Sequence, residues 1–95
     1  MRLSTEQAEI IKSIIAREIS PDARIWLFGS RTDDNRRGGD IDLFVETLRQ
    51  PGLLGELRCK IGIEDAVDLH VDLIVAKQGD QRPIASIAKT EGQRL

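Results

Sequence analysis

The spacing of apolar residues predicts three helices along the chain. Isoleucines three and four positions apart predict a first helix, which a capping box at Ser4 begins and Pro21 ends. Pro51–Gly52 opens a second helix, which Gly62 weakens, and Pro83 suits the first turn of a third. The second helix has several apolar residues on one side: Leu53, Leu54, Leu57 and Ile61.

Short runs of β-branched and aromatic residues between these helices predict three strands, at 24–28, 41–45 and 69–76. The link between the first two strands is too short for a crossover helix, so we expect them to run antiparallel. Strands interleaved with helices are typical of an α/β (α+β) domain. We therefore expect residues 1–95 to form a single domain, with a small mixed sheet of about three strands packed against helices.

Composition then excludes several classes of function. The 95 residues include one Trp, two Phe and no Tyr, so an aliphatic core is expected. Sixteen acidic and fourteen basic residues give a net charge of -2, which offers no electrostatic footprint for direct nucleic-acid or membrane binding. No apolar run approaches the roughly 20 residues of a membrane span, and the N-terminus is too polar for a signal peptide. The cytoplasm is the expected location.

Two aspartates open the second predicted strand. Asp40 and Asp42 are two positions apart, so their side chains share one face of the strand. Carboxylates side by side repel each other unless a cation lies between them. Mg²⁺ commonly takes one or two carboxylates together with substrate phosphates, so the pair predicts a magnesium site.

A third carboxylate, Asp72, interrupts the otherwise apolar third strand. An ionised group there needs a partner, either a metal or a nearby arginine. If the third strand lies beside the second, Asp72 can point at Asp40 and Asp42, and three aspartates can hold two metals for phosphoryl or nucleotidyl transfer. Asp68, four residues earlier, is the alternative. Asp72 is favoured because apolar residues follow it within the strand.

A phosphate-binding turn is predicted directly after the first strand. Gly29 lets the backbone approach a ligand, and successive N–H groups in such a turn form an anion-binding concavity. Ser30 can add a hydrogen bond to phosphate, and Arg31 can add positive charge. Arg36 and Arg37, in the following loop, are most simply solvated.

The combined pattern resembles the minimal nucleotidyltransferase domain of the DNA polymerase beta-like superfamily, and the resemblance spans nearly the whole chain. The residues that match the family pattern are Gly29, Ser30, Asp40, Asp42 and Asp72. One departure is Gly39, where many relatives have serine. The resemblance implies that the three aspartates are catalytic and hold two Mg²⁺ ions, and that Gly29, Ser30 and Arg31 bind the nucleotide substrate, ATP.

The resemblance also implies a partner. Many members of this family are antitoxins encoded beside a helical HEPN-type ribonuclease toxin, and they transfer AMP onto a tyrosine of that toxin. The elements expected in these 95 residues are used by the sheet and its cover, so we expect the acceptor to be supplied by another protein, in a hetero-oligomer.

Two other functions remain open at this point. The domain can neutralise its partner by occlusion, without chemistry, or can act as a dimeric nucleotidyltransferase on a small molecule or RNA. Among residues outside the pattern, Trp26 and Cys59 are expected to pack in the core, His70 to be structural and Asp65 to be solvated.

Overall fold

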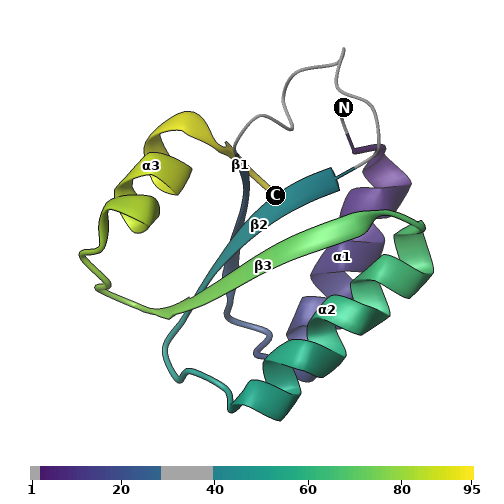
Figure 1. The fold of residues 1–95 in the computed structure, drawn as a ribbon, viewed down its shortest axis with the longest axis horizontal. Coiled ribbons are helices and arrows are strands. Elements are labelled where there is room, and N and C mark those ends of the chain that lie inside the picture. Colours follow the sequence, from purple (N-terminus) through teal and green to yellow (C-terminus); the bar gives the residue numbers. More distant parts are fainter. Residues whose placement is uncertain (1–2, 29–39) are drawn as a thin grey trace.

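Three helices and four strands form the part of the chain that the computed structural model describes, residues 3–28 and 40–95 (Figure 1). The helices are α1 (Thr5–Glu18), α2 (Leu53–Val67) and α3 (Pro83–Glu91). The strands are β1 (Arg24–Phe28), β2 (Asp40–Thr47), β3 (His70–Lys77) and β4 (Gln93–Arg94).

The strands form one mixed sheet in the order β3-β2-β1-β4. β1 runs antiparallel to β2 and to β4, which confirms the expected direction of the first pair. β2 and β3 run parallel, and α2 makes the crossover that such a pair requires. The sheet has one more strand than the sequence predicts, because the two-residue β4 is too short to leave a hydrophobic pattern.

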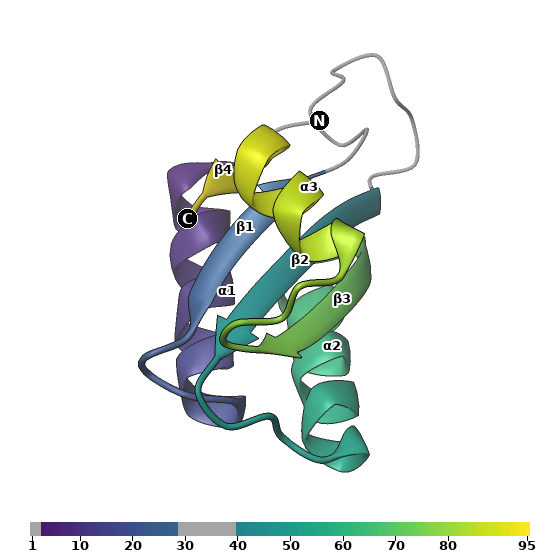
Figure 2. The ribbon, with the colours of Figure 1, turned by 90° about the vertical axis from the view of Figure 1, so that its left-hand side faces the viewer.

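The helices cover both faces of the sheet (Figure 2). α1 and α2 lie side by side on one face, and α3 lies on the other. The larger core fills the space between the sheet and α1/α2; its fully buried members include Ile11, Ile15, Ile41, Leu43 and Val71. A smaller core under α3 contains Trp26, Phe28, Phe44, Ala76, Ala85 and Ala88. Trp26 is therefore a core residue, as expected.

The first helix begins as its sequence predicts. The Gln7 backbone N–H donates to Ser4 Oγ at 3.0 Å, and the Ser4 N–H donates to Gln7 Oε1 at 2.9 Å. This reciprocal pair satisfies two N–H groups that the helix itself cannot bond. Ile11, Ile14 and Ile15 then face the core.

The second helix forms as predicted, but its apolar side does not face the core. Its apolar side at Leu53, Leu54, Leu57 and Ile61 is exposed, whereas Cys59, Ile63 and Val67 are buried. α2 continues through Gly62 without a break. Periodicity shows that a helix has an apolar side, but α2 has apolar residues on two sides, and the spacing alone does not show which side faces the core.

Candidate functional site

The parallel pairing of β2 with β3 brings two of the predicted acidic residues side by side. Asp42 lies opposite Asp72 in the register, and opposite residues of neighbouring strands are about 4.8 Å apart across the sheet. Both side chains point to the same face because the two residues have the same place in the pleat. Asp42 is half-buried and Asp72 is exposed.

These carboxylates lie on the face of the sheet that α3 covers only in part. Phe44 and Ile74 form the next row along the two strands, and both belong to the core under α3. Asp42 and Asp72 are one row nearer the strand starts, where Asp72 is open to solvent. A ligand can therefore reach this end of the sheet without displacing α3.

Asp40 begins β2 and pairs in the register with His70, one row beyond Asp42 and Asp72. The side chain of Asp40 lies outside the described residues. The register therefore aligns the three aspartates along one end of two adjacent strands, at the level of the backbone.

The end of β1 adjoins the same position. Phe28, its last residue, pairs with Asp42 across the antiparallel ladder. Gly29, Ser30 and Arg31 follow Phe28 in the sequence, and they lie outside the described residues, as do Arg36 and Arg37. The expected part of Gly29, Ser30 and Arg31 in binding phosphate stays a prediction.

The structure separates the two candidates for the third carboxylate. Asp68 is the C-cap of α2, with a left-handed φ of 56°, and its N–H donates to the Glu64 carbonyl oxygen. Asp68 precedes β3 and is exposed, whereas Asp72 lies within β3 opposite Asp42. The geometry therefore favours Asp72.

His70 is linked to Glu64, a contact that the sequence interpretation missed. His70 Nδ1 lies 3.2 Å from Glu64 Oε2, and the same oxygen accepts the Val71 N–H at 2.9 Å. Glu64 thus fixes the start of β3, next to the row of Asp42 and Asp72. The signal for this contact is weak, because a glutamate near the end of an amphipathic helix is most simply solvated.

The donor set fits magnesium in chemical type. Mg²⁺ binds oxygen ligands, and one or two carboxylates suffice when substrate phosphates and water complete the octahedron. Within residues 3–28 and 40–95, no group of three His, Cys, Asp or Glu side chains is gathered closely enough to hold a metal. Asp42 and Asp72 are therefore the two described carboxylates that would hold a magnesium ion together with substrate phosphates, and the sequence adds Asp40 as a candidate.

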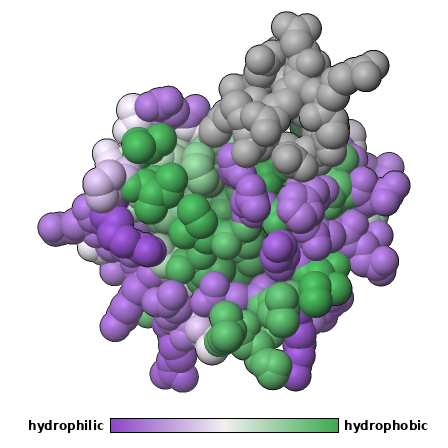
Figure 3. All heavy atoms as spheres, viewed as in Figure 1, coloured by the Kyte–Doolittle hydropathy of each residue, from purple (hydrophilic) through white to green (hydrophobic). Residues whose placement is uncertain are grey.

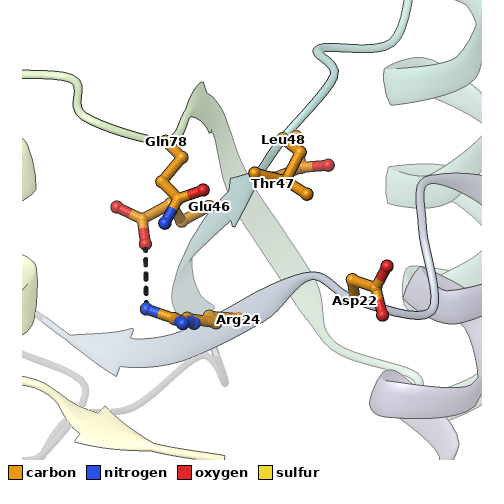
Figure 4. Close-up of a pocket in the computed structure, with 6 residues that line it drawn as sticks. All are labelled: Asp22, Arg24, Glu46, Thr47, Leu48 and Gln78. Atoms are coloured by element: carbon orange, nitrogen blue, oxygen red, sulfur yellow. Dashed lines mark ion pairs between the residues drawn. The ribbon is translucent and has the colours of Figure 1, made fainter.

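A hollow lies at the other end of β2, away from Asp42 and Asp72 (Figure 4). It is a cavity of about 120 Å³, lined by Asp22, Arg24, Glu46, Thr47, Leu48 and Gln78. Its buried carboxylate, Glu46, is already engaged by Lys89 and lies 3.9 Å from Arg24. Because Lys89 and Arg24 already neutralise Glu46, this carboxylate is not available for catalysis, and we assign the cavity no function.

Comparison with known families identifies the family of this chain. The profile of the family described as polymerase beta nucleotidyltransferase matches residues 9–95. The chain belongs to this family. Among curated proteins, none matches the sequence.

Solved structures share the fold of this nucleotidyltransferase domain. A chain from a toxin–antitoxin crystal structure with AMP-PNP superposes with a TM-score of 0.75 at 21% identity, over 97% of this chain and 72% of that chain. A chain from a MntA-HpeT toxin–antitoxin structure, a variant with two aspartates replaced by glutamate, gives 0.72 at 21% identity, over 93% and 70%. A complex of tri-AMPylated HEPN toxin with MNT antitoxin from Shewanella oneidensis gives 0.69 at 22%, over 93% and 66%.

In the described part of this nucleotidyltransferase domain, no helix combines the length and the apolar character that crossing a membrane requires.

Proposed function

We propose that this protein is a magnesium-dependent adenylyltransferase that transfers AMP from ATP to a tyrosine hydroxyl of a HEPN-type ribonuclease toxin, and so acts as its antitoxin. The observation that carries the proposal is the pairing of Asp42 with Asp72 on one face of the sheet, directly beside the end of β1. The family membership and the toxin–antitoxin neighbours support it, including one with an AMPylated toxin and one with an ATP analogue.

The proposed roles follow from the chemistry of the residues. Asp40, Asp42 and Asp72 would hold two Mg²⁺ ions, which supply positive charge to the phosphates and to the pyrophosphate leaving group. Gly29 and Ser30 would donate hydrogen bonds to the phosphates. In one neighbour, two aspartates two positions apart were replaced by glutamate. Asp40 and Asp42 have the same spacing, which supports their proposed role.

In the proposed reaction, the tyrosine oxygen forms a bond to the α-phosphorus of ATP, and the bond from that phosphorus to the pyrophosphate oxygen breaks. The hydroxyl proton must leave as the new bond forms. Asp72 is the exposed carboxylate of the described pair, and we assign it the role of proton acceptor at this position. The cytoplasm, which contains ATP, is where we expect the reaction.

The test is transfer of label from α-labelled ATP to a purified HEPN-type toxin in the presence of Mg²⁺. The wild-type protein should label the toxin, and Asp42→Asn should lower the rate by about 100-fold or more, since even an outer-shell ligand partner often contributes 10- to 100-fold. Asp65→Asn, an exposed carboxylate on α2, is the matched control and should label the toxin at the wild-type rate.

The alternative of occlusion without chemistry makes a different prediction. If Asp42→Asn protects cells from the toxin as well as wild type does, and neither protein labels it, the domain neutralises its partner by binding alone. Labelling of free aminoglycosides or tRNA, with no labelling of the toxin, would instead indicate a small-molecule or RNA nucleotidyltransferase.

A further inference from the structure

Four aliphatic side chains of α2 face solvent along one side of the helix. Leu53, Leu54, Leu57 and Ile61 have exposed fractions of 82%, 59%, 50% and 55%. Figure 3 shows hydrophobic side chains gathered over α2, at the lower right of the view. We call these four residues the α2 stripe. A contiguous apolar surface of this kind commonly marks an interaction site.

A hollow lies between the α2 stripe and the edge strand β3. Leu53 and Leu57 line it together with Leu73 of β3, and its volume is about 150 Å³. Glu56 and Lys60, one helical turn apart, form its charged border. An apolar hollow beside protruding leucines is the geometry in which a second helix inserts its own side chains.

The edge of β3 is less suited to accept another strand. The Val71 N–H donates to Glu64, and the Val75 carbonyl oxygen accepts a hydrogen bond from Gln50 Nε2 at 3.1 Å. These side chains occupy backbone groups that an added strand would need, which is a common means of preventing edge pairing. The surface therefore favours a helix rather than a strand as its partner.

The charged residues beside the hollow can pair with the same residues of a second copy of the chain. Glu56 and Lys60 have opposite signs, and among the described residues neither takes part in an ion pair. A two-fold axis that sets two copies of α2 antiparallel exchanges the positions of these residues. Glu56 of each copy then faces Lys60 of the other, twice in one interface.

We propose that two copies of this chain associate through the α2 stripe, with their α2 helices antiparallel about a two-fold axis near Leu57. Leu57 then packs against its own symmetry mate, and Leu53 packs against Ile61 of the second copy. The stripe supplies the apolar centre of the interface, and Glu56 and Lys60 supply its polar rim. α2 lies on the sheet face opposite Asp42 and Asp72, so both nucleotidyl-transfer sites of the pair stay open.

Light scattering coupled to size-exclusion chromatography tests the pairing without ATP or any toxin, so its outcome is independent of the proposed activity. At about 100 μM, where a dimer with a Kd of about 1 μM is almost fully formed, the wild-type protein should have twice the chain mass of 10.6 kDa. Leu57→Asp puts two carboxylates at the axis and should weaken the dimer by about 30-fold or more. Ile87→Asp, at a 44% exposed position on α3, is the matched control and should stay dimeric.

A charge exchange tests the register of the interface, with circular dichroism to verify folding. Glu56→Lys alone should weaken the dimer, because like charges then meet, and adding Lys60→Glu should restore it. A monomeric wild-type protein overturns the proposal, as does a Leu57→Asp variant that pairs like wild type. If the wild type is monomeric and Leu57→Asp instead loses binding to a toxin, the stripe belongs to that partner and the proposal is wrong.

Discussion

Asp68 and Asp72 occur in the same tripeptide, Val-Asp-Leu, yet only Asp72 lies within the sheet. We expect Asp72→Asn to lower adenylyl transfer by about 100-fold or more, because it removes a carboxylate opposite Asp42. Asp68→Asn should have the wild-type rate, since Asn tolerates the left-handed cap conformation well. Rates of label transfer for the two variants check this. Equal losses would mean that Asp68, and not the register, defines the third carboxylate.

The thiol of Cys59 should make the stability of the fold depend on pH. Burial, together with the nearby Glu18 carboxylate, raises the pKa of Cys59 from its ordinary 9.0 to about 11. The folded protein therefore retains the thiol proton more tightly than the unfolded chain does. The stability that this contributes is complete below pH 9 and is lost as the pH rises from about 9 to about 11.

The free energy of unfolding should accordingly fall with pH in that range, by at most about 1.4 kcal/mol for each pH unit from this group. Urea unfolding of wild type and Cys59→Ala at several pH values measures the difference. The lysines titrate in both proteins and the chain has no tyrosine, so the difference isolates the thiol. Parallel pH profiles for the two proteins would contradict the prediction.

At the scale of the elements, two glycines in similar sequence settings have opposite requirements. A Cβ at Gly62, inside α2, would lie 3.6 Å from Ile14 Cγ2, which is an ordinary contact. A Cβ at Gly92, after α3, would lie 2.3 Å from the Ala88 carbonyl oxygen and 2.9 Å from that of Leu27. Gly92 therefore allows the chain to pass close to β1. At Gly62, by contrast, the structure leaves room for a methyl group.

The same substitution should then have effects of opposite sign. Gly62→Ala should stabilise the protein by about 0.5–1 kcal/mol, because glycine is unfavourable in a helix interior. Gly92→Ala should destabilise it by about 1–3 kcal/mol through overpacking. Thermal unfolding of both variants checks the pair. A destabilised Gly62→Ala variant would show that α1 and α2 pack too closely for the methyl group.

The sequence identifies elements with a strong local signal and misses those that depend on tertiary contacts. The capping box at Ser4 and the run at 24–28 are read correctly, because their signals are local. β2 extends to Thr47, beyond the predicted end, because Glu46 and Thr47 are polar but buried under tertiary contacts. The outward direction of the α2 stripe is likewise a property of the assembled fold.

The candidate site divides in the same way. The sequence is enough to propose the residue types and to prefer Asp72 over Asp68, since an acid within an apolar strand is conspicuous. That Asp42 and Asp72 face each other requires the parallel pairing of β2 with β3, which depends on the whole crossover. The contact of Glu64 with His70 has no sequence signal of comparable strength.

At the scale of the whole molecule, α3 is held on the sheet by apolar contacts and by an ion pair with a buried carboxylate. Glu46 is 4% exposed and pairs with Lys89 of α3, whose Nζ also lies 5.5 Å from the Trp26 ring centre. Lys89→Met should lower the free energy of unfolding by about 1–3 kcal/mol, because Glu46 then loses its main partner. The fluorescence of Trp26, the one tryptophan of the chain, monitors unfolding directly.

Lys12→Met is the matched control for that measurement. Lys12 pairs with Glu9 on the surface of α1 at 3.4 Å, with both side chains about half exposed or more. Such pairs contribute little, so this variant should differ from wild type by less than about 0.5 kcal/mol. Equal effects of the two substitutions would refute a special role for the buried pair.

The alternation of β3 has a consequence for how this protein can lose activity. Val71 and Val75 are buried against α1 and α2, while Asp72 between them points to the opposite face. A slip of β3 by one residue would turn every side chain over, which would bury the acid and expose the valines. Burial of Val71 and Val75 thus fixes the register of β3, and this register sets the face to which Asp72 points. Inactivating substitutions should therefore also arise at Val71 or Val75, whose buried side chains lie on the sheet face opposite Asp72.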